Sequence, residues 1–322
     1  MEPRLIPVNA VIALCTPGDV YPATLAAAGY RVTGVEVPSP AGEGTVVIDA
    51  VLFNAVHNDV LAAEAKSGAN VDEAQAKKYG ALAADDVVRA SSINVVEKGP
   101  RSLQPVYVCL AEHVERVLRG LGKAEVAFPV LAVGIDQVTH HGAAFGDSTL
   151  DLAFHEPVSV PGFPPRFIPV DPESSDEEFD RTVMPALVRM LSREREQISG
   201  AALAEEGIQH LVLYGKRARN QIISKVEAAA RRAAERDPAT FEYNGRTANR
   251  DAIVRFVRAP EATARQGRTQ VYQAIARAAG KPVRRSTSSD QMALFDELID
   301  ELDEAGDADG DGADDGEEEA GE

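Results

Sequence analysis

The sequence predicts an α/β protein in which helices pack on a sheet, followed by a mainly helical basic region and an acidic tail. Three observations lead to this class. Short apolar segments with strand character alternate with segments of helical spacing over residues 1–157. Residues 201–285 have mostly helical character and many basic side chains. Residues 286–322 are strongly acidic and end without any hydrophobic anchor, which predicts disorder.

The first third of the chain supplies the opening elements. Residues 11–15 (VIALC) fit either a strand or a buried helical turn. Residues 18–30 predict a short helix that ends at Gly29, and the RVTGVEV segment after it alternates like a strand before a PSPAGEG loop. The segments TVVIDAVLF and DVLAAEAKS, joined by NAVHN, predict a β-hairpin. Residues 71–84 predict a helix rich in Ala and Lys.

Two further strands and their helices follow. PVYVCL predicts a strand that leads into a helix at 111–121, whose apolar residues recur at helical spacing. FPVLAVGID is a continuous apolar run, typical of a buried strand. Residues 158–200 predict a Pro-rich connection and then a helix, which begins near Ser174 with acidic residues as the helix dipole favours.

Length and composition limit the class of protein. At 322 residues the chain is long enough for two domains. It contains no apolar run of the ~18 residues that a transmembrane helix requires, and no convincing signal peptide. Cys15 and Cys109 lie in apolar surroundings and are expected to be buried free thiols. We therefore expect a cytoplasmic protein with no membrane partner.

Charge is strongly segregated along the chain. The formal net charge is −18, but residues 290–322 contain 16 acidic residues and no Lys or Arg, so the rest of the chain carries only −2. Residues 210–285 hold 17 basic against 6 acidic residues. This pattern favours DNA contact through the basic region, with Lys216, Arg217 and Arg219 as candidate phosphate-binding residues. The alternative is a helical bundle whose basic residues cover its own apolar faces or pair with the acidic body.

A candidate metal site lies in the predicted hairpin. Glu64 and Lys66 are two positions apart, so they project from one face of a strand, and the hairpin can bring Asp49 alongside them. Asp49, Glu64 and the carbonyl oxygen of Ala65 would suit Mg²⁺, which prefers oxygen ligands, and Mn²⁺ could replace it. Lys66 would hold a water molecule or stabilise developing negative charge.

The hairpin and the next helix resemble a known nuclease signature. VVIDAVLF…VLAAEAKSG is similar to the D…ExK motif of the PD-(D/E)XK nuclease superfamily, and Gln75-Ala-Lys-Lys-Tyr79 resembles the QxxxY helix of its exonuclease-like branch. The resemblance covers roughly residues 15–140 and implies a restriction-endonuclease-like mixed sheet flanked by helices. It also implies magnesium-dependent cleavage of DNA, with Asp49 and Glu64 as metal ligands and Lys66 as the catalytic lysine. Gln75 would line the site, with Tyr79 beside it at the substrate.

The sequence departs from that pattern at one position. Many members carry an acidic residue in the first helix, whereas YPATLAAAG has none and Asp19 is the nearest substitute. The expected function is a Mg²⁺-dependent DNA nuclease that acts in restriction, anti-phage defence or DNA repair. The alternative is a catalytically inactive DNA-binding or regulatory protein with the nuclease fold. A third class is an interaction protein whose basic region docks an acidic partner. A homo-oligomer or a protein partner in a larger DNA-processing system is also compatible with the sequence.

Overall fold

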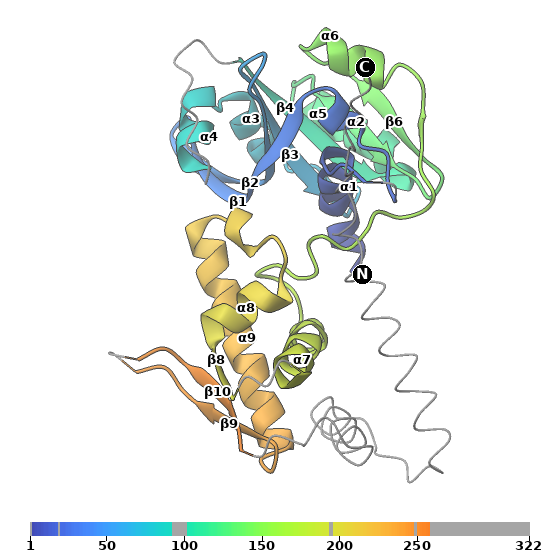
Figure 1. Cartoon of the computed structure of the whole chain (residues 1–322). Helices are drawn as coiled ribbons and strands as arrows, with labels where there is room; N and C mark the ends of the chain where they lie inside the picture. Colours follow the sequence, from blue (N-terminus) through green and yellow to red (C-terminus); the bar gives the residue numbers. More distant parts are fainter. Residues whose placement is uncertain (1, 19, 92–101, 193–195, 248–249, 258–322) are drawn as a thin grey trace, which may run out of the picture.

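The computed structural model describes residues 2–18, 20–91, 102–192, 196–247 and 250–257 (Figure 1). The acidic tail expected at 286–322 and residues 258–285 of the basic region lie outside the described residues.

The N-terminal part is built on a seven-stranded mixed sheet with the strand order β1-β2-β3-β4-β5-β6-β7. The β1/β2 and β2/β3 pairs are antiparallel, β4 runs parallel to both β3 and β5, and the last two pairs are antiparallel. The strands are β1 (Tyr30–Ala41), β2 (Gly44–Asn54), β3 (Asp59–Lys66), β4 (Ser102–Leu110), β5 (Pro129–Val133), β6 (Gln137–Gly142) and β7 (Val158–Ser159).

Helices cover both faces of this sheet and divide the apolar residues into two cores (Figure 1). Successive side chains of a strand point to opposite faces, so Leu61 and Ala63 enter one core while Val60 and Ala62 enter the other. The first core contains every residue of α1 except Pro7 and Asn9, and the second contains residues of α3, α4 and α5. The helices of this part are η1 (Pro3–Leu5), α1 (Ile6–Cys15), α2 (Thr24–Ala27), α3 (Glu73–Gly80), α4 (Ala84–Ala90), η2 (Ala111–His113), α5 (Val114–Lys123) and α6 (Ser148–Ala153).

Two local predictions need correction, and one open alternative is resolved. The ambiguous VIALC segment belongs to α1, which is buried on every side, so its apolar residues carry no helical stripe. The expected PSPAGEG loop is mostly strand, because β1 continues to Ala41. Pro38 and Pro40 are tolerated there because β1 is the edge strand of the sheet, where a missing N–H removes no ladder bond. The helix expected over 71–84 is shorter, and α4 follows it after a break.

The C-terminal part is helical with a small sheet of its own (Figure 1). Helices α7 (Asp176–Ser192), α8 (Gly200–Gly207) and α9 (Lys216–Arg236) pack on one another, with η3 (Leu211–Leu213) between the last two. The strands β8 (Gln197–Ser199), β10 (Ile253–Phe256) and β9 (Phe241–Asn244) form an antiparallel sheet in that order. Helix α7 packs against both α8 and α9, and β8 packs against α8, so contacts cross the predicted boundary at 200/201.

Hydrogen bonds and one β-bridge join the C-terminal part and the connecting residues 168–170 to the seven-stranded sheet and α1. The buried amide of Asn9 accepts from Ile168 N at 2.6 Å and donates to Ile168 O at 3.1 Å. The Tyr214 hydroxyl donates to Val170 O at 2.7 Å. Val35 of β1 forms a parallel bridge with Tyr214, and Gly215 N donates to Val35 O at 2.8 Å. The edge of the sheet is therefore covered by the start of α9.

Within the described residues, no helix is both long enough and apolar enough to cross a membrane.

Candidate functional site

Helix α3 places Gln75 and Tyr79 on one face, one turn apart. The helix begins after Asp72, whose Oδ1 accepts from Gln75 N at 3.0 Å and so caps the first turn. Residues four apart lie above each other on a helix. Both side chains therefore point toward the end of β3, where Glu64 lies.

Glu64 is almost completely enclosed and fully bonded. It is 3% exposed, and its Oε1 lies 2.5 Å from Lys66 Nζ and accepts from Gln75 Nε2 at 2.9 Å. Its Oε2 accepts from the Tyr79 hydroxyl at 2.5 Å. Lys66 Nζ also donates to Gln75 Oε1 at 2.9 Å, which closes a ring of three side chains. A buried carboxyl group needs hydrogen-bond or ion-pair partners to offset its loss of contact with water, and this one has three.

Tyr79 has a different place from the one expected. We predicted it at the substrate, but its side chain is 0% exposed and its hydroxyl contacts Glu64 and, at 3.2 Å, Val47 O. Burial and the nearby Glu64 carboxylate raise the pKa of Tyr79 well above its usual value, so it remains a hydrogen-bond donor. In this structure Tyr79 positions Glu64 and does not reach the surface.

Asp49 lies on β2, at a point where the regular alternation of side chains between the two faces of the sheet is interrupted. Ile48 belongs to one core and Ala50 to the other, although residues two apart in a regular strand share a face. The Asp49 side chain turns toward the neighbouring strand, where its Oδ2 accepts from Ala65 N at 2.6 Å. Burial and repulsion from Glu64 and Glu36 raise the pKa of Asp49 well above its usual value, against the opposing effects of the Ala65 N–H and Lys66.

Glu36 is an acidic residue of the site that the sequence analysis missed. Val35 pairs with Ala50 and Val37 with Ile48, so Glu36 lies across from Asp49. Its φ is +52°, a left-handed value that costs a non-glycine residue of the order of 1–3 kcal/mol. Burial and repulsion from neighbouring carboxylates, Asp171 first, raise the pKa of Glu36 to about 7. The sequence signal that could have identified Glu36 is a single acidic residue between two valines in a predicted strand (VEV).

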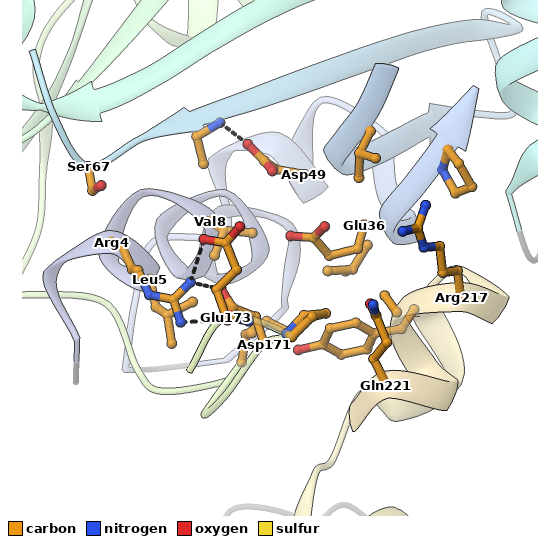
Figure 2. Close-up of a pocket in the computed structure, with 18 of the residues that line it drawn as sticks. Arg4, Leu5, Val8, Glu36, Asp49, Ser67, Asp171, Glu173, Arg217 and Gln221 are labelled. Carbon is orange, nitrogen blue, oxygen red and sulfur yellow. Dashed lines mark hydrogen bonds and ion pairs between the residues drawn. The ribbon is translucent and has the colours of Figure 1, made fainter. Parts of the chain in front are cut away.

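A cavity of about 620 Å³ connects these residues with the C-terminal part. Figure 2 shows Asp49 and Glu36 on the strands on one side, and Arg217 and Gln221 of α9 on the other. Among the predicted site residues, Asp49, Ala65, Gln75 and Arg217 line the cavity. Glu64, Lys66 and Tyr79 are not in its lining, so their cluster lies behind Gln75 and Ala65.

A charged strap closes another side of the cavity (Figure 2). The Arg4 guanidinium forms a bidentate pair with Asp171 and lies 3.7 Å from a Glu173 oxygen. Asp171 also accepts from the N–H groups of Glu173 and Ser174, at 2.7 and 2.8 Å. The strap lay beyond sequence reasoning because Arg4 and Asp171 are 167 positions apart.

The basic residues of the C-terminal part are mostly paired internally. Arg219, expected to bind phosphate, lies 2.7 Å from Glu205. Asp180 pairs with Arg232 at 2.6 Å and with Arg236 at 2.7 Å. Lys216 and Arg217 are exposed and make no ion pair or hydrogen bond within the described part of the chain. Of the three predicted phosphate-binding residues, these two are therefore available.

The donor set suits a hard divalent cation held by few protein ligands. Asp49 faces the cavity, and a cation there would relieve the repulsion that raises its pKa. In the described ranges, no three His, Cys, Asp or Glu side chains are grouped as a metal cluster. Mg²⁺ is commonly bound by one or two carboxylates, completed by water and substrate phosphate. The residues present fit that mode, with Asp49 as the accessible ligand and Glu64 and the Ala65 carbonyl as its expected neighbours.

One family model matches the chain, that of the MJECL32 domain, over residues 5–107. The matched stretch runs from η1 into β4 and includes Asp49 and the whole Glu64 cluster. Comparisons with curated proteins and with solved structures found no significant match.

Proposed function

We propose that the protein is a Mg²⁺-dependent DNA nuclease whose site is formed by Asp49, Glu64, Lys66 and Gln75. One observation carries the proposal: the ExK and QxxxY residues, chosen from the sequence for their resemblance to a nuclease signature, form one bonded cluster, and the Asp of the motif lies beside it at a cavity. Lys66 and Gln75 both contact Glu64. Asp49 is joined to the same strand through Ala65 N.

Each side chain has a separate task in the proposed hydrolysis. Asp49 presents its carboxylate to the cavity, where the scissile phosphate would lie. Tyr79 and Gln75 fix the orientation of Glu64, and Lys66 supplies a positive charge near the developing charge of the transition state. When bound, a divalent ion lowers the pKa of a coordinated water and neutralises phosphate charge. Water would attack the phosphorus and form a new P–O bond while one P–O ester bond breaks. The reaction would leave two DNA ends.

The test is DNA degradation with Mg²⁺ by wild type, Lys66→Ala and Glu64→Gln. We expect wild type to cleave and each variant to lose most of the rate, on the order of 10²-fold or more, since each removes a group that acts in the transition state. Glu43→Gln changes an exposed acid in the turn between β1 and β2 and serves as the matched control. Cleavage that survives both site substitutions would refute the assignment.

An inactive DNA-binding or regulatory protein is the second candidate. It is favoured by the complete bonding of Glu64, which leaves neither of its oxygens without a partner. On this alternative, the wild type binds DNA but cleaves none with Mg²⁺ or Mn²⁺, and Lys66→Ala binds as tightly as wild type. Calorimetric titration with Mg²⁺ separates the two functions further. The nuclease must bind the ion, and Asp49→Asn would weaken that binding.

A further inference from the structure

Four segments of the chain line the cavity beside Asp49. The strands β1 to β3 form one side, α1 and residues 168–173 form others, and α9 lies across from the strands (Figure 2). Its volume of about 620 Å³ lies within the range of sites that enclose a drug-sized ligand. For a nucleic acid, that corresponds to about one or two nucleotides.

The walls are fixed by bonds between these segments. Arg4 and Asp171 form a bidentate pair across one wall, and Tyr214 donates to Val170 O at 2.7 Å in the next. Gly215 N donates to Val35 O at 2.8 Å, which holds the start of α9 against β1. A base-paired duplex presents its phosphates on a wide surface with a second strand attached, so Asp49 is accessible to it only if these contacts open. An unpaired strand can insert with its base turned out of the stack.

The lining is divided by chemical character in the way that an unpaired nucleotide requires. Leu5, Val8 and Ile168 form an apolar wall of the kind that suits the face of a base. Arg217 lines the cavity from α9 and is exposed and without an ion pair in the described residues, as is its neighbour Lys216. The other sides carry the acidic residues Glu36, Asp49, Asp171 and Glu173, whose charges repel phosphate and leave the α9 side as the place for it.

We infer that this cavity takes an unpaired strand of DNA, with its backbone phosphate on Arg217 and its base against the apolar wall. The inference rests on the proposed nuclease function and adds the substrate class. Arg217 binds substrate and does not take part in the chemical step, so its loss affects KM and leaves kcat unchanged. A duplex becomes a substrate where it has a single-stranded extension or frayed end.

The first measurement compares cleavage by the full chain with Mg²⁺ of fluorescein-labelled oligonucleotides of one sequence. The substrates are a single strand, a blunt duplex and a duplex with a single-stranded extension. We expect the single strand to be cleaved at least about tenfold faster than the blunt duplex, with the extended duplex between them. A blunt duplex cleaved as fast as the single strand overturns the inference and leaves the nuclease function in place.

The second measurement isolates the phosphate contact. Arg217→Gln should raise KM for the single strand about tenfold with kcat unchanged, and should reduce the slope of log affinity against log salt by about 0.7. Arg116→Gln is the matched control, because Arg116 is exposed on α5 and has no ion pair in the same described residues. Equal KM and salt slope for the two variants overturn the role of Arg217.

Fluorescence anisotropy without divalent ions separates this inference from the nuclease function. Binding of the single strand about tenfold tighter than the blunt duplex, weakened by Arg217→Gln, supports the cavity as a single-strand site even if no substrate is cleaved. In that case the nuclease proposal fails alone. If the single strand and the blunt duplex are bound equally tightly and cleaved equally fast, the proposal that unpaired DNA is the substrate is overturned.

Discussion

Replacing Glu36 with glutamine tests whether burial and the neighbouring acids make the ionised form of Glu36 destabilising. The pKa of Glu36 is raised from 4.5 to about 7. Between these values the folded protein binds more protons than the unfolded chain, so the free energy of unfolding falls as pH rises through this window. This direction is opposite to that of an acid in a salt bridge. Glu36→Gln cannot ionise and removes this part of the pH dependence.

The size of the effect follows from the pKa difference. A change from 4.5 to about 7 corresponds to about 3 kcal/mol, fully lost only above pH 7. Water that reaches the cavity screens part of this repulsion, so the figure is an upper value. At pH 5 the stabilities of wild type and Glu36→Gln should be similar, while at pH 8 the variant should be more stable. The corresponding rise in Tm is roughly 5–10 °C.

The assay is thermal or urea unfolding of the full chain from pH 5 to pH 8, without divalent ions. Glu43→Gln is the control, because Glu43 is an exposed acid on the same hairpin and should follow the wild-type profile. A smaller slope should remain in Glu36→Gln, because the pKa of Asp49 is also raised. If stability depends on pH in the same way for wild type and Glu36→Gln, ionised Glu36 does not destabilise the folded protein.

Three other substitutions test contacts described above. Gly215→Val should lower Tm by several degrees and reduce activity. A Cβ at this position would lie 2.4 Å from the Glu36 carbonyl oxygen, and overpacking costs about 1–3 kcal/mol. An unchanged Tm and rate would contradict the close packing of the start of α9 on β1. Tyr79→Phe removes one donor from the buried Glu64 and should cost about 1.5–3 kcal/mol in urea unfolding, with a loss of kcat. Asp180→Asn should cost about 1–2 kcal/mol, because two arginines of α9 lose their carboxylate partner; wild-type stability in urea would show that the pairs contribute nothing.

Local patterns predicted the hairpin and its motif because both depend on neighbours in sequence. The alternation of TVVIDAVLF and DVLAAEAKS gives β2 and β3, and two-residue spacing alone brings Glu64 beside Lys66. Helical spacing then brings Gln75 and Tyr79 to the same carboxylate. Each of these contacts spans at most 15 positions.

The missed residues depend on packing between distant segments. Glu36 lay in a predicted strand, but its place across from Asp49 follows from the pairing register of β1 with β2, which no local pattern gives. The Arg4 strap has no local signature. The charge count of the basic region also gave no information about pairing, and the ion pairs of Asp180 show that part of this charge is neutralised within the fold. Charge segregation along a chain therefore overstates the charge that a partner meets.

The contacts of α1 also set the order in which the chain can fold. Every residue of this N-terminal helix is buried, and Asn9 is bonded to Ile168, 159 positions later. A ribosome adding 5–20 residues per second needs roughly 10–30 s to synthesise that interval. During this time α1 lacks its contacts with the segment around Ile168. These native contacts join residues far apart in sequence, which slows folding. The first helix made is thus among the last to be completed, and a shortened chain ending near residue 157 would leave its apolar surface exposed to aggregation.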